Sequence, residues 1–193
     1  MKDWKKEIWL IPNLLSLFRL LLIPVYVTIY ICAESNAEYF VAAAILAVSC
    51  LTDMIDGKIA RRFNMISNLG RILDPLADKF TQLALIICLA LKYPVLWYML
   101  GLFVLKESFQ LIAGSIILKK GMILKGALLT GKISTTVLFL SLIIMVLLPS
   151  LPANTVAIIT AVDAFFLSVS FADYVLMYVR KSSNITSLDQ NEP

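Results

Sequence analysis

The chain has 193 residues, of which 60% are hydrophobic and 16% are charged, and its mean hydropathy is +0.88. Long apolar runs and only seven glycines exclude an ordinary soluble domain and predict an all-α membrane protein. The formal net charge is +4, but the lysines and arginines cluster in short segments between apolar runs, which fits membrane topology better than a nucleic-acid-binding face.

The chain begins with mixed basic and apolar residues. Trp4, Ile8 and Ile11 share one helical face, so we expect a short N-terminal amphipathic helix in the headgroup layer, with a frayed basic tail as the alternative. Six apolar runs then predict six transmembrane helices, at about Ile11–Ile31, Tyr39–Arg62, Gly70–Leu91, Val95–Leu118, Leu128–Leu148 and Asn154–Val179. We expect one membrane domain over residues 1–181 and a disordered polar tail over residues 182–193.

Basic residues gather at one end of this predicted bundle. That end collects Lys2, Lys5, Lys6, Arg61, Arg62, Arg71, Lys119, Lys120, Lys125, Lys132, Arg180 and Lys181. The other end has Lys92 together with Glu34 and Glu38. The positive-inside rule then places both termini in the cytoplasm, in agreement with an even number of spans.

The second and third spans carry four carboxylates, which are Asp53, Asp56, Asp74 and Asp78. The members of each pair are three or four residues apart and so share one helical face. At about 1.5 Å per residue, both pairs lie at matched depths below the cytoplasmic ends of adjacent antiparallel helices. Such groups are costly in apolar helices unless they pair, bind metal or line a wet cavity. The sequence therefore predicts that the four carboxylates meet.

Four gathered carboxylates require cations, because like charges a few Å apart force protonation. The set contains neither histidine nor cysteine, and oxygen ligands alone favour hard ions, so we expect two Mg²⁺ or Mn²⁺ ions. Two such ions suit a diphosphate under attack by a hydroxyl. Arg61 is suited to bidentate phosphate contact, while Gly57 and Ala60 leave space beside Asp53 for a ligand.

Other interpretations of the carboxylates remain open. Structural ion pairs with Lys58, Arg61 or Lys79 would account for some of them, and an ion- or proton-conducting bundle would account for the acids alone. A channel needs a continuous polar path, whereas Tyr39–Cys50 and Leu83–Leu91 are nearly unbroken apolar runs. Arg19, inside the first span, either snorkels to the interface or points into a polar cavity.

The motif Asp-x2-Asp-Gly-x2-Ala-Arg-x8-Gly-x3-Asp-x3-Asp resembles the signature of the CDP-alcohol phosphatidyltransferase family. This chain fills all eight fixed positions, with Asp53, Asp56, Gly57, Ala60, Arg61, Gly70, Asp74 and Asp78. The similarity extends to the Ile11-Pro12-Asn13 entry, the Asp74-Pro-Leu-Ala-Asp78-Lys79 run and the six-span plan. It is nearest to the phosphatidylglycerophosphate synthase and cardiolipin synthase branch.

The resemblance implies a six-helix enzyme, usually a homodimer, that uses CDP-diacylglycerol as donor and releases CMP. It implies that Asp53, Asp56, Asp74 and Asp78 bind the metal ions and that Asp78 also serves as the general base. Gly57, Ala60 and Gly70 would then accommodate the CDP group, with Arg61 on its phosphates. We expect the site at the cytoplasmic side of a bacterial plasma membrane.

The acceptor alcohol is the open part of this resemblance. Phosphatidylglycerophosphate synthases use glycerol 3-phosphate, an anion that needs cationic groups near the metals. The candidates are Lys106, Lys132, Lys125 and Arg71, although Lys106 can instead pair with Glu107 or Asp163 and Lys132 can be a solvated interfacial charge. We expect glycerol 3-phosphate as acceptor, with phosphatidylglycerol, as in a cardiolipin synthase, or another polar alcohol as alternatives.

Overall fold

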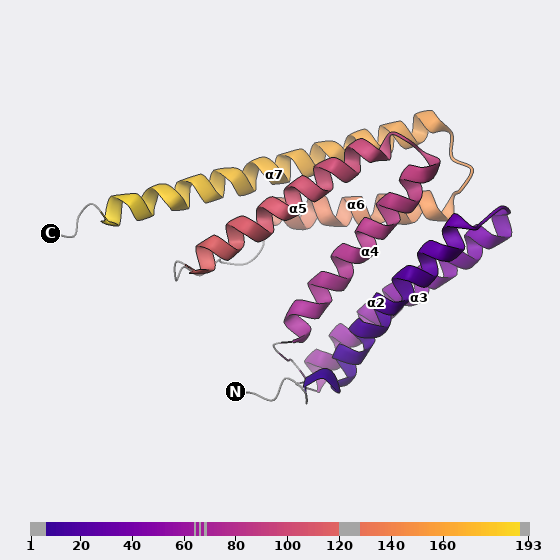
Figure 1. Ribbon diagram of the computed structural model, residues 1–193, viewed down its shortest axis with the longest axis horizontal. Coiled ribbons are helices and arrows are strands. Elements are labelled where there is room, and N and C mark those ends of the chain that lie inside the picture. Colours follow the sequence, from indigo (N-terminus) through magenta and orange to yellow (C-terminus); the bar gives the residue numbers. More distant parts are fainter. Residues whose placement is uncertain (1–6, 64, 66, 68, 120–127, 190–193) are drawn as a thin grey trace. The chain divides into compact units, whose positions relative to one another are not determined.

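A computed structural model describes residues 7–63, 65, 67, 69–119 and 128–189, without the side chains of 61, 117–119 and 181–189. This part of the chain contains helices and no strand, which confirms the predicted all-α membrane fold. Figure 1 shows the helices α2 (Ile11–Ile31), α3 (Asn36–Arg62), α4 (Gly70–Lys92), α5 (Leu96–Lys119), α6 (Leu129–Leu147) and α7 (Ala153–Asp189).

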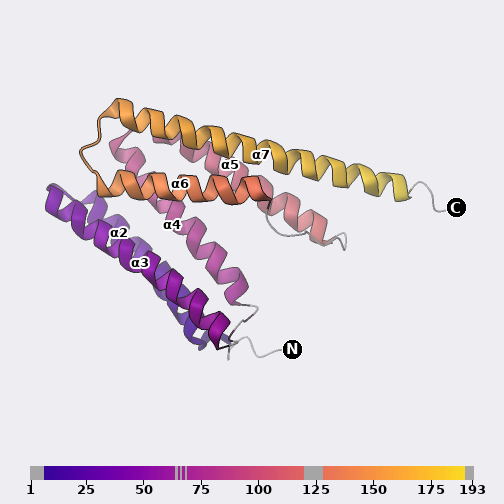
Figure 2. The ribbon, with the colours of Figure 1, turned by 180° about the vertical axis from the view of Figure 1, so that it is seen from behind.

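The chain divides into two compact units. The first contains Met1–Lys92 and Leu142–Ser150, and so includes α2, α3 and α4. The second contains Tyr93–Ser141 and Leu151–Pro193, and so includes α5, most of α6 and α7. Within the first unit α2 packs against both α3 and α4, and within the second α5 packs against α7. Figures 1 and 2 show α2 and α3 side by side along most of their lengths.

Local sequence explains where the helices begin. Ser35 caps α3: its Oγ accepts a hydrogen bond from the Glu38 amide, and the Ser35 amide donates to Glu38 Oε2 at 3.1 Å. This reciprocal pair satisfies two amides that the first turn leaves without helical partners. Pro12 occupies the first turn of α2, where its fixed φ and missing N–H cost little. Local sequence therefore fixes the starts of α2 and α3.

Five of these helices are long and apolar enough to cross a membrane, namely α2, α3, α5, α6 and α7. The sequence predicted six spans, so the count by length and composition is one lower. α4 is the exception because Arg71, Asp74, Asp78 and Lys79 all lie in its first half. Large apolar side chains such as Leu21, Leu111 and Ile158 are more than 60% exposed, as expected for helices that face lipid. The protein is a multi-pass membrane protein.

The sequence prediction is not tested at the N-terminal end of the chain, and the structure differs from it at the C-terminal end. Residues 1–6 are outside the described residues, so the amphipathic N-terminal helix stays a prediction. At the other end α7 continues to Asp189 instead of giving way to a disordered tail from residue 182. No proline or glycine interrupts the sequence of α7, and these are the residues that most often end a helix.

Candidate active site

A polar joint fixes the start of α4 against α2. Asn13 Nδ2 donates to Ser67 Oγ at 2.9 Å and to the Glu7 carbonyl at 2.6 Å. Ser67 Oγ in turn accepts from the Gly70 amide at 2.9 Å, and Glu7 Oε2 accepts from the Leu69 amide at 3.1 Å. The first amides of α4 thus find acceptors that a helix start needs. The joint sets the position of the helix that carries Asp74 and Asp78.

Gly70 allows this joint to close. A Cβ atom at this position would lie 2.6 Å from Asn13 Oδ1 and 3.1 Å from Ser67 Oγ. Asn13 is 1% exposed and hydrogen-bonded, so it cannot easily move aside. Gly70 was predicted to accommodate the CDP group, and the structure gives it a packing role between α2 and α4. The two roles do not exclude each other, because the helix start lies near the acidic residues.

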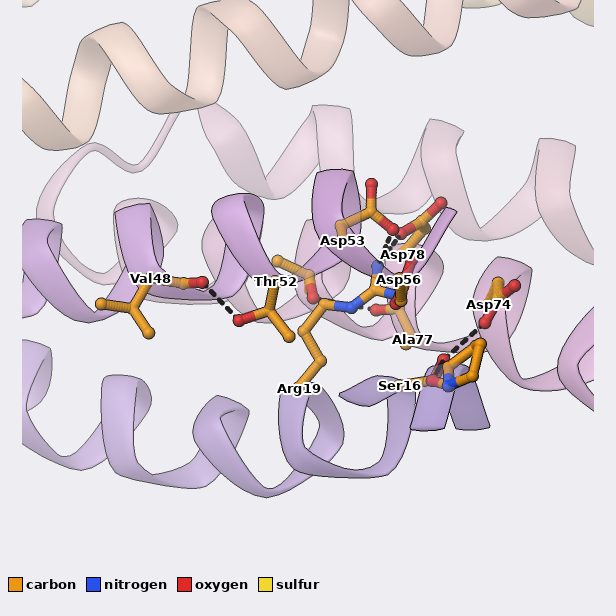
Figure 3. A network of polar contacts seen from close by, with 11 residues as sticks. Ser16, Arg19, Val48, Thr52, Asp53, Asp56, Asp74, Ala77 and Asp78 are labelled. Carbon is orange, nitrogen blue, oxygen red and sulfur yellow. Dashed lines mark hydrogen bonds and ion pairs between the residues drawn. The ribbon is translucent and has the colours of Figure 1, made fainter. Parts of the chain in front are cut away.

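Arg19 of α2 gathers three of the four predicted carboxylates (Figure 3). Its Nη1 donates to Asp53 Oδ1 of α3 and, at 2.8 Å, to Asp78 Oδ1 of α4. Its Nη2 donates to Asp56 Oδ2 at 2.8 Å. One nitrogen atom therefore joins a carboxylate from each acidic helix, which places Asp53 and Asp78 side by side.

The fourth carboxylate is held separately. Ser16 Oγ donates to Asp74 Oδ1 at 2.5 Å, and Ser16 lies one turn before Arg19 on α2. Hence α2 contacts all four acidic residues, three through a guanidinium and one through a hydroxyl. The sequence predicted that α3 and α4 bring the carboxylates together as neighbours. The structure adds α2 as the helix that packs against both and links their acidic faces.

The acidic cluster, defined here as Asp53, Asp56, Asp74 and Asp78, has a closed and an open side. The Arg19 and Asp56 side chains are each only 3% exposed, which places this ion pair inside the helical unit. The Asp53 and Asp78 side chains are 45% and 50% exposed. A ligand can therefore reach Asp53 and Asp78 without any helix moving apart, while Asp56 and Arg19 form the floor beneath them.

The chemistry of this donor set fits a hard divalent cation. The cluster offers only carboxylate oxygens, which Mg²⁺, Mn²⁺ and Ca²⁺ prefer, and three of its members already converge on one cationic group. Four carboxylates and one guanidinium leave a formal charge of −3, which calls for further cations. Among the described side chains, however, no three acids are arranged as a ready-made cage for one ion, because the guanidinium lies between them.

The remaining residues predicted to bind the CDP group are placed only in part. Gly57 and Ala60 are half-buried on α3, one and two turns beyond Asp53. Arg61 also belongs to α3, but its side chain lies outside the described residues. Gly57 has no side chain and Ala60 has only a methyl group, so this face of α3 leaves room for a neighbouring group.

Three of the four predicted acceptor-binding residues belong to described helices, each to a different one. Lys106 of α5 is 2% exposed, and its Nζ donates to Glu107 Oε1 at 2.8 Å and lies 5.9 Å from the centre of the Tyr174 ring. The pairing with Glu107 is the alternative that the sequence left open. Lys132 at the start of α6 and Arg71 at the start of α4 are exposed, and Lys125 lies outside the described residues.

Sequence reasoning missed the part played by α2. Ser16 was not singled out, and Arg19 was left undecided between the interface and a polar cavity. The signal for Arg19 was its charge inside an apolar span, which is costly without a partner. The signal for Ser16 was weaker: it lies three residues before Arg19, on the same helical face.

Comparison with known proteins shows which proteins this chain resembles. The family model described as CDP-alcohol phosphatidyltransferase matches residues 9–177. The chain is 30% identical over 178 residues to the "Probable phosphatidylglycerophosphate synthase" of Mycobacterium tuberculosis, covering 91% of this chain and 84% of that protein. It is 33% identical over 171 residues to the CDP-diacylglycerol–glycerol-3-phosphate 3-phosphatidyltransferase of Aquifex aeolicus, covering 86% of this chain and 94% of that protein.

A second kind of relative matches a shorter part. The chain is 41% identical over 88 residues to a Schizosaccharomyces pombe protein named as a fusion of cardiolipin synthase (CMP-forming) and mitochondrial hydrolase. This match covers 46% of the present chain and 14% of the fusion protein. The name of this shorter match includes cardiolipin synthase, whereas neither of the two longer matches is named as one.

Proposed function

The chain belongs to the CDP-alcohol phosphatidyltransferase family, and we propose that it transfers the phosphatidyl group of CDP-diacylglycerol to glycerol 3-phosphate. The products are phosphatidylglycerophosphate and CMP. The observation that carries the proposal is the meeting of Asp53 and Asp78, from two helices, at one exposed point above a buried Arg19. Names of relatives that cover most of this chain point to the same acceptor.

Asp78 is the base in this proposal. The acceptor hydroxyl attacks the phosphorus that carries the diacylglycerol group, the bond from that phosphorus to the CMP oxygen breaks, and the hydroxyl proton passes to Asp78. The Asp78 side chain is half exposed, so an alcohol can reach it. A carboxylate of ordinary basicity is a weak base for an alcohol, so its position must supply much of the effect. Gly57 and Ala60 make room for the cytidine nucleotide, and Arg61 binds its phosphates.

Asp53, Asp56, Asp74 and Asp78 would hold two divalent ions, Mg²⁺ or Mn²⁺. When bound, such ions neutralise the negative charge that develops on the diphosphate as CMP leaves. The residues of this chain position the ligand oxygens: α3 and α4 present carboxylate oxygens from two directions, and Ser16 orients Asp74. The exposed side of Asp53 and Asp78 admits the diphosphate while the buried floor excludes water.

The acceptor phosphate needs positive charge. Lys132 and Arg71 are exposed and lie at helix starts, and they are the candidates among the described residues. Lys125 is a further candidate from the sequence. Lys106 donates a hydrogen bond to Glu107, so it contributes less to binding of the acceptor phosphate. A cardiolipin synthase, with phosphatidylglycerol as acceptor, is the alternative that the name on the shorter match favours.

A single assay separates these acceptors. Purified protein is incubated with CDP-diacylglycerol and Mg²⁺ or Mn²⁺, with either glycerol 3-phosphate or phosphatidylglycerol, and CMP release and the lipid product are followed. We expect product with glycerol 3-phosphate, little with phosphatidylglycerol, and none after the metal is removed with EDTA and before it is restored. Product formed with phosphatidylglycerol alone would make the chain a cardiolipin synthase. Undiminished activity in EDTA would remove the metal ions from the proposal.

The proposal also includes the setting of the enzyme. The basic residues listed above favour cytoplasmic termini and a cytoplasmic active site in a bacterial plasma membrane. This arrangement requires α4 to cross the membrane although its first half is polar. α2 then covers part of that polar half, because it contacts Asp74 and Asp78. We expect the enzyme to act as a homodimer.

A further inference from the structure

Arg19 occupies an unusual place for a charged residue. It lies midway along α2, a helix of 21 residues that is otherwise almost wholly apolar, and it is 2% exposed. A buried guanidinium in such a helix is costly unless it is paired. Its pairs are Asp53, Asp56 and Asp78, and within the described part of the chain its Nε has no hydrogen-bond partner. Its stability in this position therefore depends on the acidic cluster alone.

The dependence also runs the other way. Asp53 and Asp78 come from different helices and touch the same nitrogen, Nη1. Without a cation between them, two carboxylates that meet at one point repel each other. Arg19 therefore holds the acidic faces of α3 and α4 together. This is the task that the proposed divalent ions would perform in the working enzyme.

Arg19 and a divalent ion compete for the same oxygens. A hard ion binds carboxylate oxygens at about 2.0–2.6 Å, and the Oδ1 atoms of Asp53 and Asp78 already accept from Nη1. A guanidinium in contact with those oxygens would lie within a few Å of the ion, where two positive charges repel strongly. The pair between Nη2 and Asp56 is separate and is buried. It can persist while the contacts of Nη1 are given up.

We propose that Arg19 is the resident counter-cation of the acidic cluster, which holds the carboxylates in place and yields Asp53 and Asp78 when a divalent ion binds. The inference rests on the proposed function, because it takes the cluster as the metal site. Arg19 is thus a positioning residue: it touches the cluster and not the reacting atoms. Its presence weakens metal binding and strengthens the metal-free protein. A purely structural ion pair would do only the second.

The test measures Mn²⁺ binding to purified full-length protein by calorimetry or by the electron paramagnetic resonance signal of free Mn²⁺. In Arg19→Gln, loss of one positive charge beside the ion lowers the Kd for Mn²⁺ by about tenfold or more. The metal-free variant also has a lower Tm than wild type, and Mn²⁺ raises that Tm by more than it raises the wild-type Tm. Arg19→Lys keeps the charge without the fork of donors, so its Kd stays near the wild-type value.

A matched control is available on α3. Arg62→Gln removes the same charge from an exposed position at the end of that helix, and its Kd for Mn²⁺ changes by no more than about twofold because solvent and salt screen the charge. If Arg19→Gln binds Mn²⁺ no more tightly than wild type, the inference is wrong while the proposed function stands. If neither protein binds Mn²⁺, the metal site itself is wrong and the inference falls with it.

Arg19→Gln leaves three carboxylates without their partner and can fail to fold. The pair of variants Asp53→Asn and Asp53→Asn with Arg19→Gln then replaces the first comparison, because the second member removes one charge of each sign. The double variant should bind Mn²⁺ more tightly than Asp53→Asn by about tenfold. Equal affinities in this pair would overturn the role of Arg19.

Discussion

In the candidate active site, ion pairs rather than apolar contacts position the individual side chains. Arg19 and Asp56 are buried together, whereas Asp53 and Asp78 keep about half of their side-chain surface exposed. Removing one partner of a buried ion pair destabilises a protein by about 3–5 kcal/mol, because the other charge is left buried without a partner. The buried pair therefore anchors the site, and the exposed carboxylates are left to meet a ligand.

Asp78→Asn tests the role of the base at this scale. The amide has nearly the shape of the carboxylate but accepts no proton, so turnover should fall by about 10²–10⁴-fold. CMP release from CDP-diacylglycerol in the presence of glycerol 3-phosphate measures the effect, and circular dichroism confirms that the helices persist. Glu34→Gln, which neutralises an exposed carboxylate between α2 and α3, should leave turnover unchanged. An Asp78→Asn variant that keeps most of its activity would exclude Asp78 as base.

At the scale of helices, the decisive contact is the close approach of α2 and α4. Asn13, Ser67 and Gly70 form hydrogen bonds and a tight contact at the start of α4. The same two helices meet again where Ser16 holds Asp74 and where Arg19 holds Asp78. Because a helix is nearly rigid over this length, a shift at its start displaces both carboxylates. Packing at Gly70 and geometry at the acidic cluster are thus coupled.

Gly70→Ala tests this coupling. The added methyl group would meet buried Asn13 and should destabilise the protein by about 1–3 kcal/mol, seen as a lower Tm in detergent. Turnover should fall as well, because Asp74 and Asp78 move with α4. Gly101→Ala is the matched control, since a Cβ there has nothing within 4 Å and alanine is the better helix former. A Gly70→Ala variant as stable and active as Gly101→Ala would show that the joint does not control the site.

At the scale of the whole molecule, the number of membrane crossings depends on α4. Five of the described helices have the length and composition for a span, and α4 has the length with a polar first half. If α4 crosses, the two termini lie on the same side; if it does not, they lie on opposite sides. The distribution of basic residues favours the first arrangement, because Lys92 is the only lysine or arginine assigned to the far side.

Thiol labelling of intact cells distinguishes the two arrangements. Cys32 is exposed just after α2 and should react with a membrane-impermeant maleimide added outside. Arg180→Cys in a Cys32→Ser background puts a thiol near the other end of the chain, and we expect it to react only after the cells are broken. The Cys32→Ser protein alone should stay unlabelled in intact cells. Labelling of the Arg180→Cys protein from outside would mean that α4 does not cross.

The sequence predicted the helices well because hydropathy and helix boundaries depend on nearby residues. α2 has the predicted bounds, and the other helices begin or end within a few residues of the predicted ones, apart from the longer C-terminal end of α7. The charged first half of α4 was visible in the sequence, and it is the reason that α4 does not have the composition of a typical span. The spacing of Asp53, Asp56, Asp74 and Asp78 was likewise enough to group each pair on one face.

What the sequence by itself determined is the membrane class, the helices and the acidic residues that share a face. Only the tertiary structure decided that α2 packs against both acidic helices and that Arg19 and Ser16 divide the four carboxylates between them. Periodicity along one helix is a local property, whereas the choice of neighbour depends on contacts between residues more than thirty positions apart. For that reason the charge of Arg19 was plain in the sequence, and its partners were not.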